Sequence, residues 1–67
     1  MVTNTDRPEV GQIWADLDKR MVGRKVVIDY VDPHYVRVHS LISGRHATIS
    51  RRRLRPTHNG FELVGKV

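Results

Sequence analysis

The stretch of sequence that decides the fold runs from residue 24 to residue 42 and reads RKVVIDYVDPHYVRVHSLI. Residues 24–31 form a run rich in β-branched side chains, which favour strands. Residues 35–42 begin with a strict alternation, so that Val36 and Val38 point to one face of a strand and their neighbours to the other. Asp32-Pro33-His34 lies between these runs, and proline presets the backbone for a turn. The stretch therefore predicts two strands joined by a tight turn.

Three shorter runs on either side continue this pattern. Residues 10–15, with Gly11 as a bulge or turn, predict a first strand, and residues 61–64 predict the last one. Residues 45–50 predict a further strand, which follows a tight hairpin turn at Ser43-Gly44.

The segments between these strands predict turns rather than helices. Residues 51–56 show neither a helical nor a strand period, which indicates a single 3-10 turn that buries Leu54 and stops at Pro56. Residues 16–23 form a loop that could hold one helical turn capped by Asp16, but this loop is too short for a stable helix.

Together these elements predict an all-β fold, a small five-stranded SH3-like barrel, because a sheet that curls onto itself removes its exposed strand edges. We expect a flexible tail over residues 1–8 and a single domain over residues 9–67. The alternation within the strands predicts a core made of Val10, Ile13, Val26, Ile28, Val36, Val38, Ile42, Ala47, Ile49, Leu54, Phe61 and Leu63.

The composition excludes several classes of function. A chain of 67 residues without cysteine has neither a disulfide nor a thiolate metal site, and it leaves little room for a deep substrate cleft. Its apolar stretches are too short for a membrane span, and the expected location is the cytoplasm. No nucleophile and base can be named, and no phosphate-binding loop is present. We expect no enzymatic activity, no cofactor, no small-molecule substrate and no membrane partner.

Two groups of residues with the right chemistry for a metal or a catalytic site have the wrong spacing for it. No pair of the four histidines has the helical i, i+4 spacing of a metal site, which indicates surface positions for them (His34, His39, His46 and His58). Asp16 and Asp18 could form a carboxylate pair, but Lys19-Arg20 follows them directly, which favours a solvated loop.

Charge is distributed unevenly along the chain. The formal net charge is +5; residues 1–32 hold six acids and five bases, whereas residues 33–67 hold seven bases and one acid, Glu62. Such asymmetry favours a polyanion or an acidic protein surface as partner. Solubility is the alternative explanation, since small domains commonly carry a net charge of this size.

Five arginines lie within eleven residues that contain no acid, namely Arg45, Arg51, Arg52, Arg53 and Arg55. Guanidinium groups pair bidentately with phosphate and carboxylate. A tight turn cannot send all of residues 51–53 to one face, so we expect two of the three to share a patch with Arg55, widened by Arg37 and His39 from a neighbouring strand. The alternative is a solvated rim, or arginines held by Asp29, Asp32 or Glu62.

Two aromatic residues are candidates for contact with a partner. Tyr35 alternates with Val36 and is expected to point outward, where it would offer a stacking face. Trp14, the single tryptophan, is either an exposed anchor for a partner or part of the core, and a core this small favours the structural role.

Several segments resemble short proteins of actinobacteria and their bacteriophages, a group without an assigned function. They read GQIWAD at residues 11–16, GR at residues 23–24, RLRPT at residues 53–57 and GFELV at residues 60–64. The expected strand order is also similar to that of SH3-like modules of the KOW, Tudor and chromo types, which bind RNA, DNA or protein tails. Because fold does not fix function, no binding residue is carried over from these modules.

Two hypotheses about function follow. The first is a sequence-tolerant nucleic-acid-binding module, in which arginines contact phosphates and Tyr35 stacks on a base. Its predicted site consists of Arg37, Arg45, Arg51, Arg52, Arg53, Arg55 and Tyr35, with Trp14 as a further anchor. The second is a protein-interaction module, such as a phage-encoded modulator of a host protein, which uses the same basic patch against an acidic surface or offers a strand edge.

Overall fold

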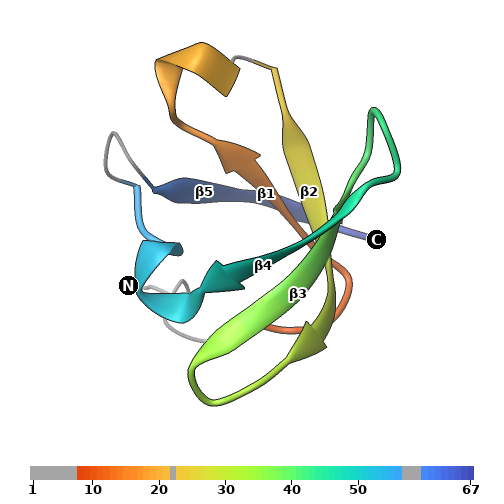
Figure 1. Cartoon of the computed structure of the whole chain (residues 1–67), viewed down its shortest axis with the longest axis vertical. Helices are drawn as coiled ribbons and strands as arrows, with labels where there is room; N and C mark the ends of the chain where they lie inside the picture. The colour runs from red at the N-terminus through yellow and green to blue at the C-terminus, as the bar shows by residue number, and fades with distance from the viewer. Residues whose placement is uncertain (1–7, 22, 57–59) are drawn as a thin grey trace.

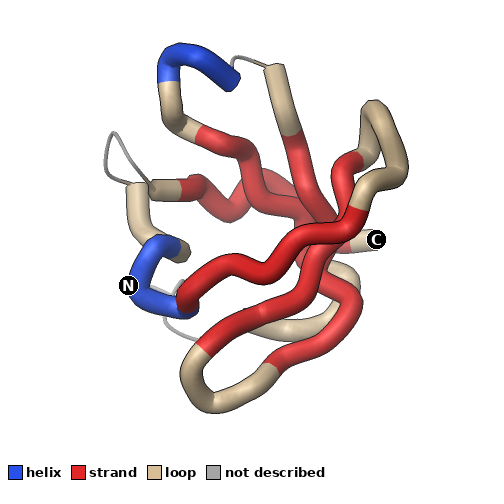
Figure 2. Tube along the Cα trace, in the orientation of Figure 1, coloured by secondary structure: helices blue, strands red, loops and turns tan. Residues whose placement is uncertain are grey.

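Five β-strands follow one another in this computed structural model, which describes residues 8–21, 23–56 and 60–67 (Figures 1 and 2). Their bounds are β1 (Gln12–Asp16), β2 (Lys25–Val31), β3 (Tyr35–Ser40), β4 (His46–Ser50) and β5 (Phe61–Lys66). Two short 3-10 turns join them, η2 (Lys19–Met21) after β1 and η3 (Arg51–Arg53) after β4. The predicted all-β fold, with a 3-10 turn ahead of the last strand, is confirmed. The expected tail lies, apart from Pro8, outside the described residues.

The strands form one antiparallel sheet in the order β4-β3-β2-β1-β5. This sheet curls so strongly that β3 and β4 lie in front of β1 and β5 in Figure 1, as in an SH3-like barrel. Within the described ranges no ladder joins β4 to β5, so the barrel is open along this line and both strands keep one free edge. No helix in the described part of the chain is long and apolar enough to cross a bilayer.

The inner face of the curled sheet carries the hydrophobic core. The buried cluster consists of Trp14, Val26, Ile28, Val36, Val38, Ile49, Leu54 and Phe61, and Val31, Ala47 and Leu63 pack against it. Most of the predicted core is therefore confirmed, including Leu54, which lies just after η3. Val27 is also buried, on the outer side of the central strand β2, where its register partners are Ile13 and His39.

The orientation of β1 differs from the prediction. Burial follows Gln12, Trp14 and Asp16, so Ile13 faces outward and is half-buried, while Trp14 is fully buried. This arrangement is possible because the two inward polar side chains have partners. Gln12 Oε1 accepts hydrogen bonds from Trp14 Nε1 at 3.1 Å and from the Glu9 amide at 3.0 Å. The indole therefore takes the place in the core that the alternation had assigned to Ile13.

Two further predicted core residues are exposed. Val10 is 58% exposed because it precedes Gly11 in a turn where glycine adopts a φ of 94°. Ile42 is 75% exposed because β3 ends at Ser40, two residues earlier than expected. The Ser40 hydroxyl accepts hydrogen bonds from the amides of Ile42 and Ser43, which turns the chain before Ile42 can join the strand.

The loop between β1 and β2 is organised by its two aspartates. Asp16 is buried, accepts a hydrogen bond from the Asp18 amide at 3.0 Å, and has a carboxylate oxygen 3.7 Å from the Arg24 guanidinium. Asp18 precedes η2 and accepts a hydrogen bond from the Arg20 amide, so Asp18 rather than Asp16 caps the predicted turn. The description of these carboxylates as a plain solvated loop is therefore wrong for Asp16.

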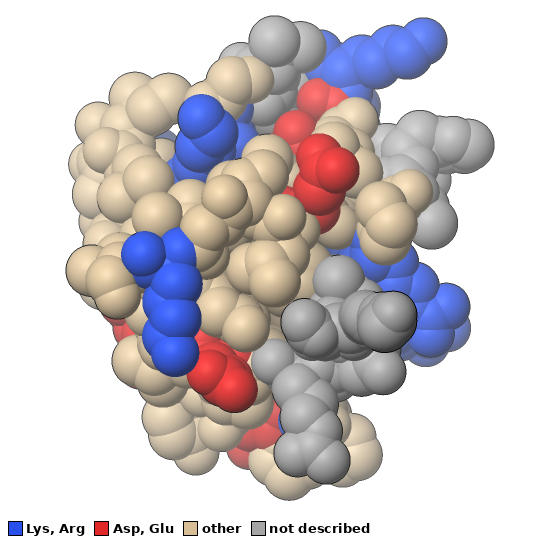
Figure 3. Space-filling view, turned by 180° about the vertical axis from the view of Figure 1, so that it is seen from behind, with Lys and Arg blue, Asp and Glu red and all other residues tan. Residues whose placement is uncertain are grey.

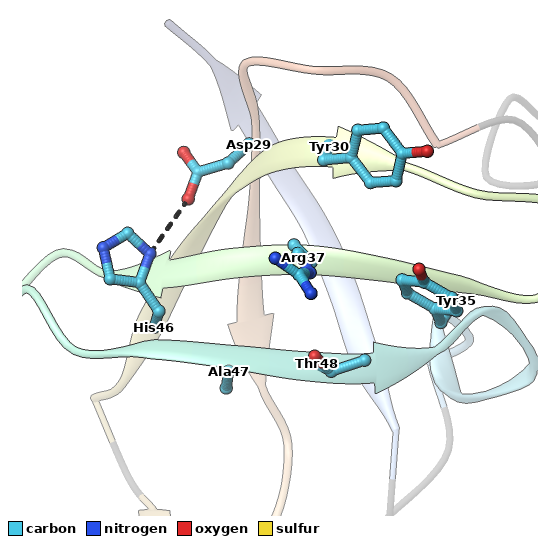
Figure 4. Close-up of a pocket in the computed structure, with 7 residues that line it drawn as sticks. All are labelled: Asp29, Tyr30, Tyr35, Arg37, His46, Ala47 and Thr48. Atoms are coloured by element: carbon cyan, nitrogen blue, oxygen red, sulfur yellow. Dashed lines mark ion pairs between the residues drawn. The ribbon is translucent and has the colours of Figure 1, made fainter.

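An irregularity in β2 decides which side chains reach the outer face. Ile28 pairs with Val38 on β3, but Tyr30 pairs with Arg37, so Asp29 is an extra residue in the ladder. Such a bulge keeps two consecutive residues on one side of the strand. Figure 4 shows Asp29 and Tyr30 on the same face as Arg37.

Candidate binding surface

The outer face of β2, β3 and β4 holds a shallow groove of about 660 Å³ (Figure 4). We call this hollow the aromatic groove; it is lined by Asp29, Tyr30, Tyr35, Arg37, His46, Ala47 and Thr48. Strict alternation in β3 sends Tyr35 and Arg37 outward, and the register places them opposite Ser50 and Thr48 of β4. The groove is thus built by the alternation in β3 together with the bulge in β2, and its side chains come from three neighbouring strands.

Two tyrosines occupy one end of the aromatic groove. The ring centroids of Tyr30 and Tyr35 lie 6.5 Å apart with the rings tilted by 43°, and Tyr30 is 51% exposed. The prediction that Tyr35 points outward is confirmed. Tyr30 was missed because its spacing from Val26 and Ile28 indicates an inward position, and nothing in the sequence signals the bulge at Asp29.

Asp29 and His46 line the other end of the groove, and His39 contacts both of them. His39 Nδ1 lies 2.8 Å and 2.9 Å from the two oxygens of Asp29, and His46 Nδ1 lies 3.6 Å from Asp29 Oδ2. The two imidazole rings are 5.9 Å apart. Each contact becomes an ion pair when the imidazole is protonated. No group of three such side chains among the described residues is arranged to hold a metal ion, and His58 lies outside those residues.

A second hollow of about 540 Å³ lies beside η3, and we call it the arginine groove. It is lined by Pro8, Pro33, Arg51, Arg52, Leu54, Arg55 and Pro56. The expectation that two arginines of the turn share a patch with Arg55 is confirmed, and the two are Arg51 and Arg52. Arg53 lies elsewhere, with its guanidinium 5.3 Å from the centre of the Phe61 ring.

Arg51 differs from its neighbours because it also holds the fold together. Its Nη1 donates to the backbone carbonyls of Asp32 at 3.1 Å and Pro33 at 3.4 Å, and its amide donates to the His34 carbonyl at 3.1 Å. These bonds fasten η3 to the turn between β2 and β3. Arg52 and Arg55 are exposed, and no ion pair involves them within the described ranges.

Residues of the two grooves come close together at one end of the β3–β4 ladder. Tyr35, in the aromatic groove, pairs with Ser50, and the next residue of the chain is Arg51, in the arginine groove. Asp29 is the single acid among the residues that line either groove. Asp32 lies near the junction, where its carboxylate accepts a hydrogen bond from the His34 amide at 3.0 Å. The structure thus places two predicted residues, Tyr35 and Arg37, in the aromatic groove and three, Arg51, Arg52 and Arg55, in the arginine groove.

Two predicted site residues lie away from this surface. Arg45 is exposed but precedes β4, at the opposite end of that strand from η3, and lines neither groove. Trp14 is fully buried, with its indole nitrogen bonded to Gln12, so the hypothesis of an exposed anchor is wrong. Its ring is the largest side chain that is fully buried in the core.

The opposite side of the molecule has a different charge pattern. Seen from behind, acidic and basic side chains are interspersed there (Figure 3). The ion pairs between carboxylates and Lys or Arg in the described chain are Glu9–Lys66, Asp16–Arg24 and Asp18–Arg20. All of them involve residues of the first half of the chain or of β5. Arg37, Arg52 and Arg55 take part in none of these pairs, and neither do Lys19 and Lys25.

Comparisons of the chain with protein-family models, with curated proteins and with solved structures find no match. The function of this surface must therefore be inferred from the side chains that form it.

Proposed function

We propose that this protein is a nucleic-acid-binding module, and that the aromatic and arginine grooves together form its binding surface. The observation that carries the proposal is that Tyr35 of the aromatic groove pairs with Ser50, whose neighbour in the chain is Arg51 of the arginine groove. Aromatic rings next to cationic side chains suit a ligand that presents flat bases along a chain of phosphates.

Electrostatics supports phosphate as the anion. Arg37, Arg52 and Arg55 are exposed, and no ion pair to a carboxylate involves them in the described part of the chain. Binding a phosphate therefore does not require breaking an existing ion pair, and the release of counterions from the nucleic acid adds to the affinity. Contacts of this kind fix position without reading sequence, so the proposed binding is tolerant of sequence.

The second candidate function is binding of an acidic protein segment, and the observation in its favour is the free edge of β4. An extended peptide could add to this edge through main-chain hydrogen bonds. Nucleic acid is favoured because Tyr30 and Tyr35 lie on the face of the sheet, on β2 and β3, rather than along that edge.

Titration with fluorescently labelled oligonucleotides tests the proposal. We expect binding at low salt that weakens log-linearly as salt rises, with a slope of about 0.9 per phosphate contact on duplex DNA. A triple variant carrying Arg37→Gln, Arg52→Gln and Arg55→Gln should flatten this slope by about 2–3. Arg51 is kept in this variant because it holds the turn between β2 and β3.

The matched control removes the same amount of charge from other positions, by Arg20→Gln, Lys25→Gln and Lys66→Gln. The control should bind like the wild type. The melting temperatures of both variants should stay close to that of the wild type, since exposed charges contribute little to stability. Equal weakening of both variants would show attraction by net charge alone. Absence of binding at low salt would contradict the proposal and favour the protein partner.

A further inference from the structure

We infer that the aromatic groove takes up an unpaired base, so that the preferred ligand is single-stranded rather than duplex nucleic acid. This inference rests on the proposed function and adds to it the class of ligand. The observation behind it is that Tyr30 and Tyr35 lie on the outer face of the sheet beside Arg37 rather than in the core (Figure 4).

The tyrosine pair is arranged to receive a third ring. With centroids 6.5 Å apart and a tilt of 43°, Tyr30 and Tyr35 are not stacked face to face. About half of Tyr30 is exposed, and both side chains line the same hollow. A base that enters this hollow can bury ring surface of Tyr30 that is now in contact with water, and stacking of this kind tolerates any base because every base has a π face.

Duplex nucleic acid cannot use this feature. In a double helix each base is stacked between its neighbours and paired with its partner, so a protein reaches phosphates and base edges but not base faces. Splayed-out bases that stack on aromatic side chains are the usual target of proteins that bind single strands. The arginine groove alone would serve either form, whereas the tyrosines discriminate between them.

Residues around the tyrosines favour a nucleotide over an organic cation. Aromatic pairs on β-sheets can also hold quaternary ammonium groups, but Arg37 pairs with Tyr30 across the ladder and places a positive charge in the groove. Asp29, the acid of the groove, is engaged by His39 at 2.8 Å. The distance from His39 to Tyr35 along β3 is about 13 Å, from a rise of roughly 3.3 Å per residue. Arg37 thus places a positive charge beside the tyrosines, which suits a base attached to a phosphate.

The geometry also indicates the path of the strand. A base at Tyr30 and Tyr35 lies beside the Arg37 guanidinium and the Thr48 hydroxyl, which can contact its flanking phosphate or sugar. The adjoining phosphates then pass the junction at Arg51 and reach Arg52 and Arg55. We therefore place the base on the face of β2 and β3 and its neighbouring phosphates beside η3.

The test compares a labelled single strand of mixed sequence with a hairpin duplex that has the same number of phosphates and whose loop is a non-nucleotide linker, so that the hairpin holds no unpaired base. We expect the single strand to bind at least tenfold more tightly at the same salt concentration. A double variant with Tyr30→Leu and Tyr35→Leu should lose about ten- to a hundredfold in affinity for the single strand, the cost of lost stacking. Its affinity for the hairpin should stay within about twofold, because phosphate contacts remain.

The control is the double variant with Tyr30→Phe and Tyr35→Phe, which keeps both ring faces and should bind like the wild type. Thermal melts of both variants show that they are folded, and nuclear magnetic resonance of the wild type should show ligand-induced shifts of the Tyr30 and Tyr35 ring protons. Equal affinity for single strand and hairpin, with no effect of the leucine variant, would overturn this inference and leave the proposed function standing. Absence of any binding by the wild type would overturn both this inference and the proposed function.

Discussion

Gln12 and Trp14, two residues apart on β1, are joined by a hydrogen bond inside the core, from the indole Nε1 to the amide Oε1 at 3.1 Å. The same oxygen accepts a bond from the Glu9 amide, and thus it connects the start of the described chain to the centre of the barrel. A buried indole N–H needs such a partner, because an unpaired donor costs free energy.

We predict that Gln12→Leu lowers the free energy of unfolding by about 1–3 kcal/mol, since it leaves the indole donor unpaired. Denaturant titration followed by circular dichroism measures this change. Repeating the substitution in a Trp14→Phe background removes the donor, so the cost of Gln12→Leu should become smaller there. An equal cost in both backgrounds would show that the bond does not couple the two residues.

Ile49 tests the register of β4. It is 4% exposed and pairs with Val36, while the preceding residue, Thr48, faces outward. Ile49→Ala should lower the free energy of unfolding by about 2–5 kcal/mol because it opens a cavity. Thr48→Ala, one position away, should stay within about 0.5 kcal/mol. Similar melting temperatures for the two variants would contradict the inward orientation of Ile49.

Arg51 and Arg52 are neighbours in sequence that should differ in their effect on stability. Arg51→Gln removes the charged donor that holds the carbonyls of Asp32 and Pro33, and we expect a loss of about 1 kcal/mol. Arg52→Gln affects an exposed side chain and should change stability by less than about 0.5 kcal/mol. Thermal melts of the two variants, which carry the same charge, measure the difference. If Arg52→Gln were the more damaging, the assignment of roles in η3 would be wrong.

Asp18 should titrate at unusually low pH. The side-chain hydrogen bond from Arg20, followed by the bond from the Arg20 amide, lowers the pKa of Asp18 from 3.8 to about 2. Because the pKa of Asp18 is lowered in the folded state, its ionised carboxylate stabilises the fold above pH 3.8. This contribution is lost as the pH falls from 3.8 towards 2. Carboxyl-carbon nuclear magnetic resonance measures the midpoint.

The control for Asp18 is Arg20→Gln, which removes the main cause and should move the midpoint back towards 3.8. A wild-type midpoint already near 3.8 would show that the Asp18–Arg20 pair does not persist in solution.

The sequence predicts the strands well where period-2 patterns are strong. Val36 and Val38 alternate with polar residues, and both are fully buried in β3. In β1 the pattern was ambiguous, because Ile13 and Trp14 are both large and apolar. Their orientation depends on whether Gln12 and Asp16 find partners inside the barrel, and only the assembled fold supplies those partners.

The sequence predicts that the candidate surface is rich in arginine, but it does not predict the shape of this surface. Five arginines within eleven residues that contain no acid are visible in the sequence, whereas the separation of Arg53 from Arg52 depends on the path of η3 and on the position of Phe61. Tyr30 reaches the outer face because of the irregular ladder at Asp29. A bulge is set by the pairing of two strands, so no local pattern within β2 reveals it.

Asp29 also has a consequence for how such a surface could change during evolution. Without this residue, Ile28 and Tyr30 would be consecutive and would still face Val38 and Arg37, as they do now. Loss of a single codon would therefore delete the acid and its contacts with His39 and His46 while the rest of the strand kept its neighbours. The negative charge at that end of the groove can thus be removed by one deletion, independently of the tyrosines.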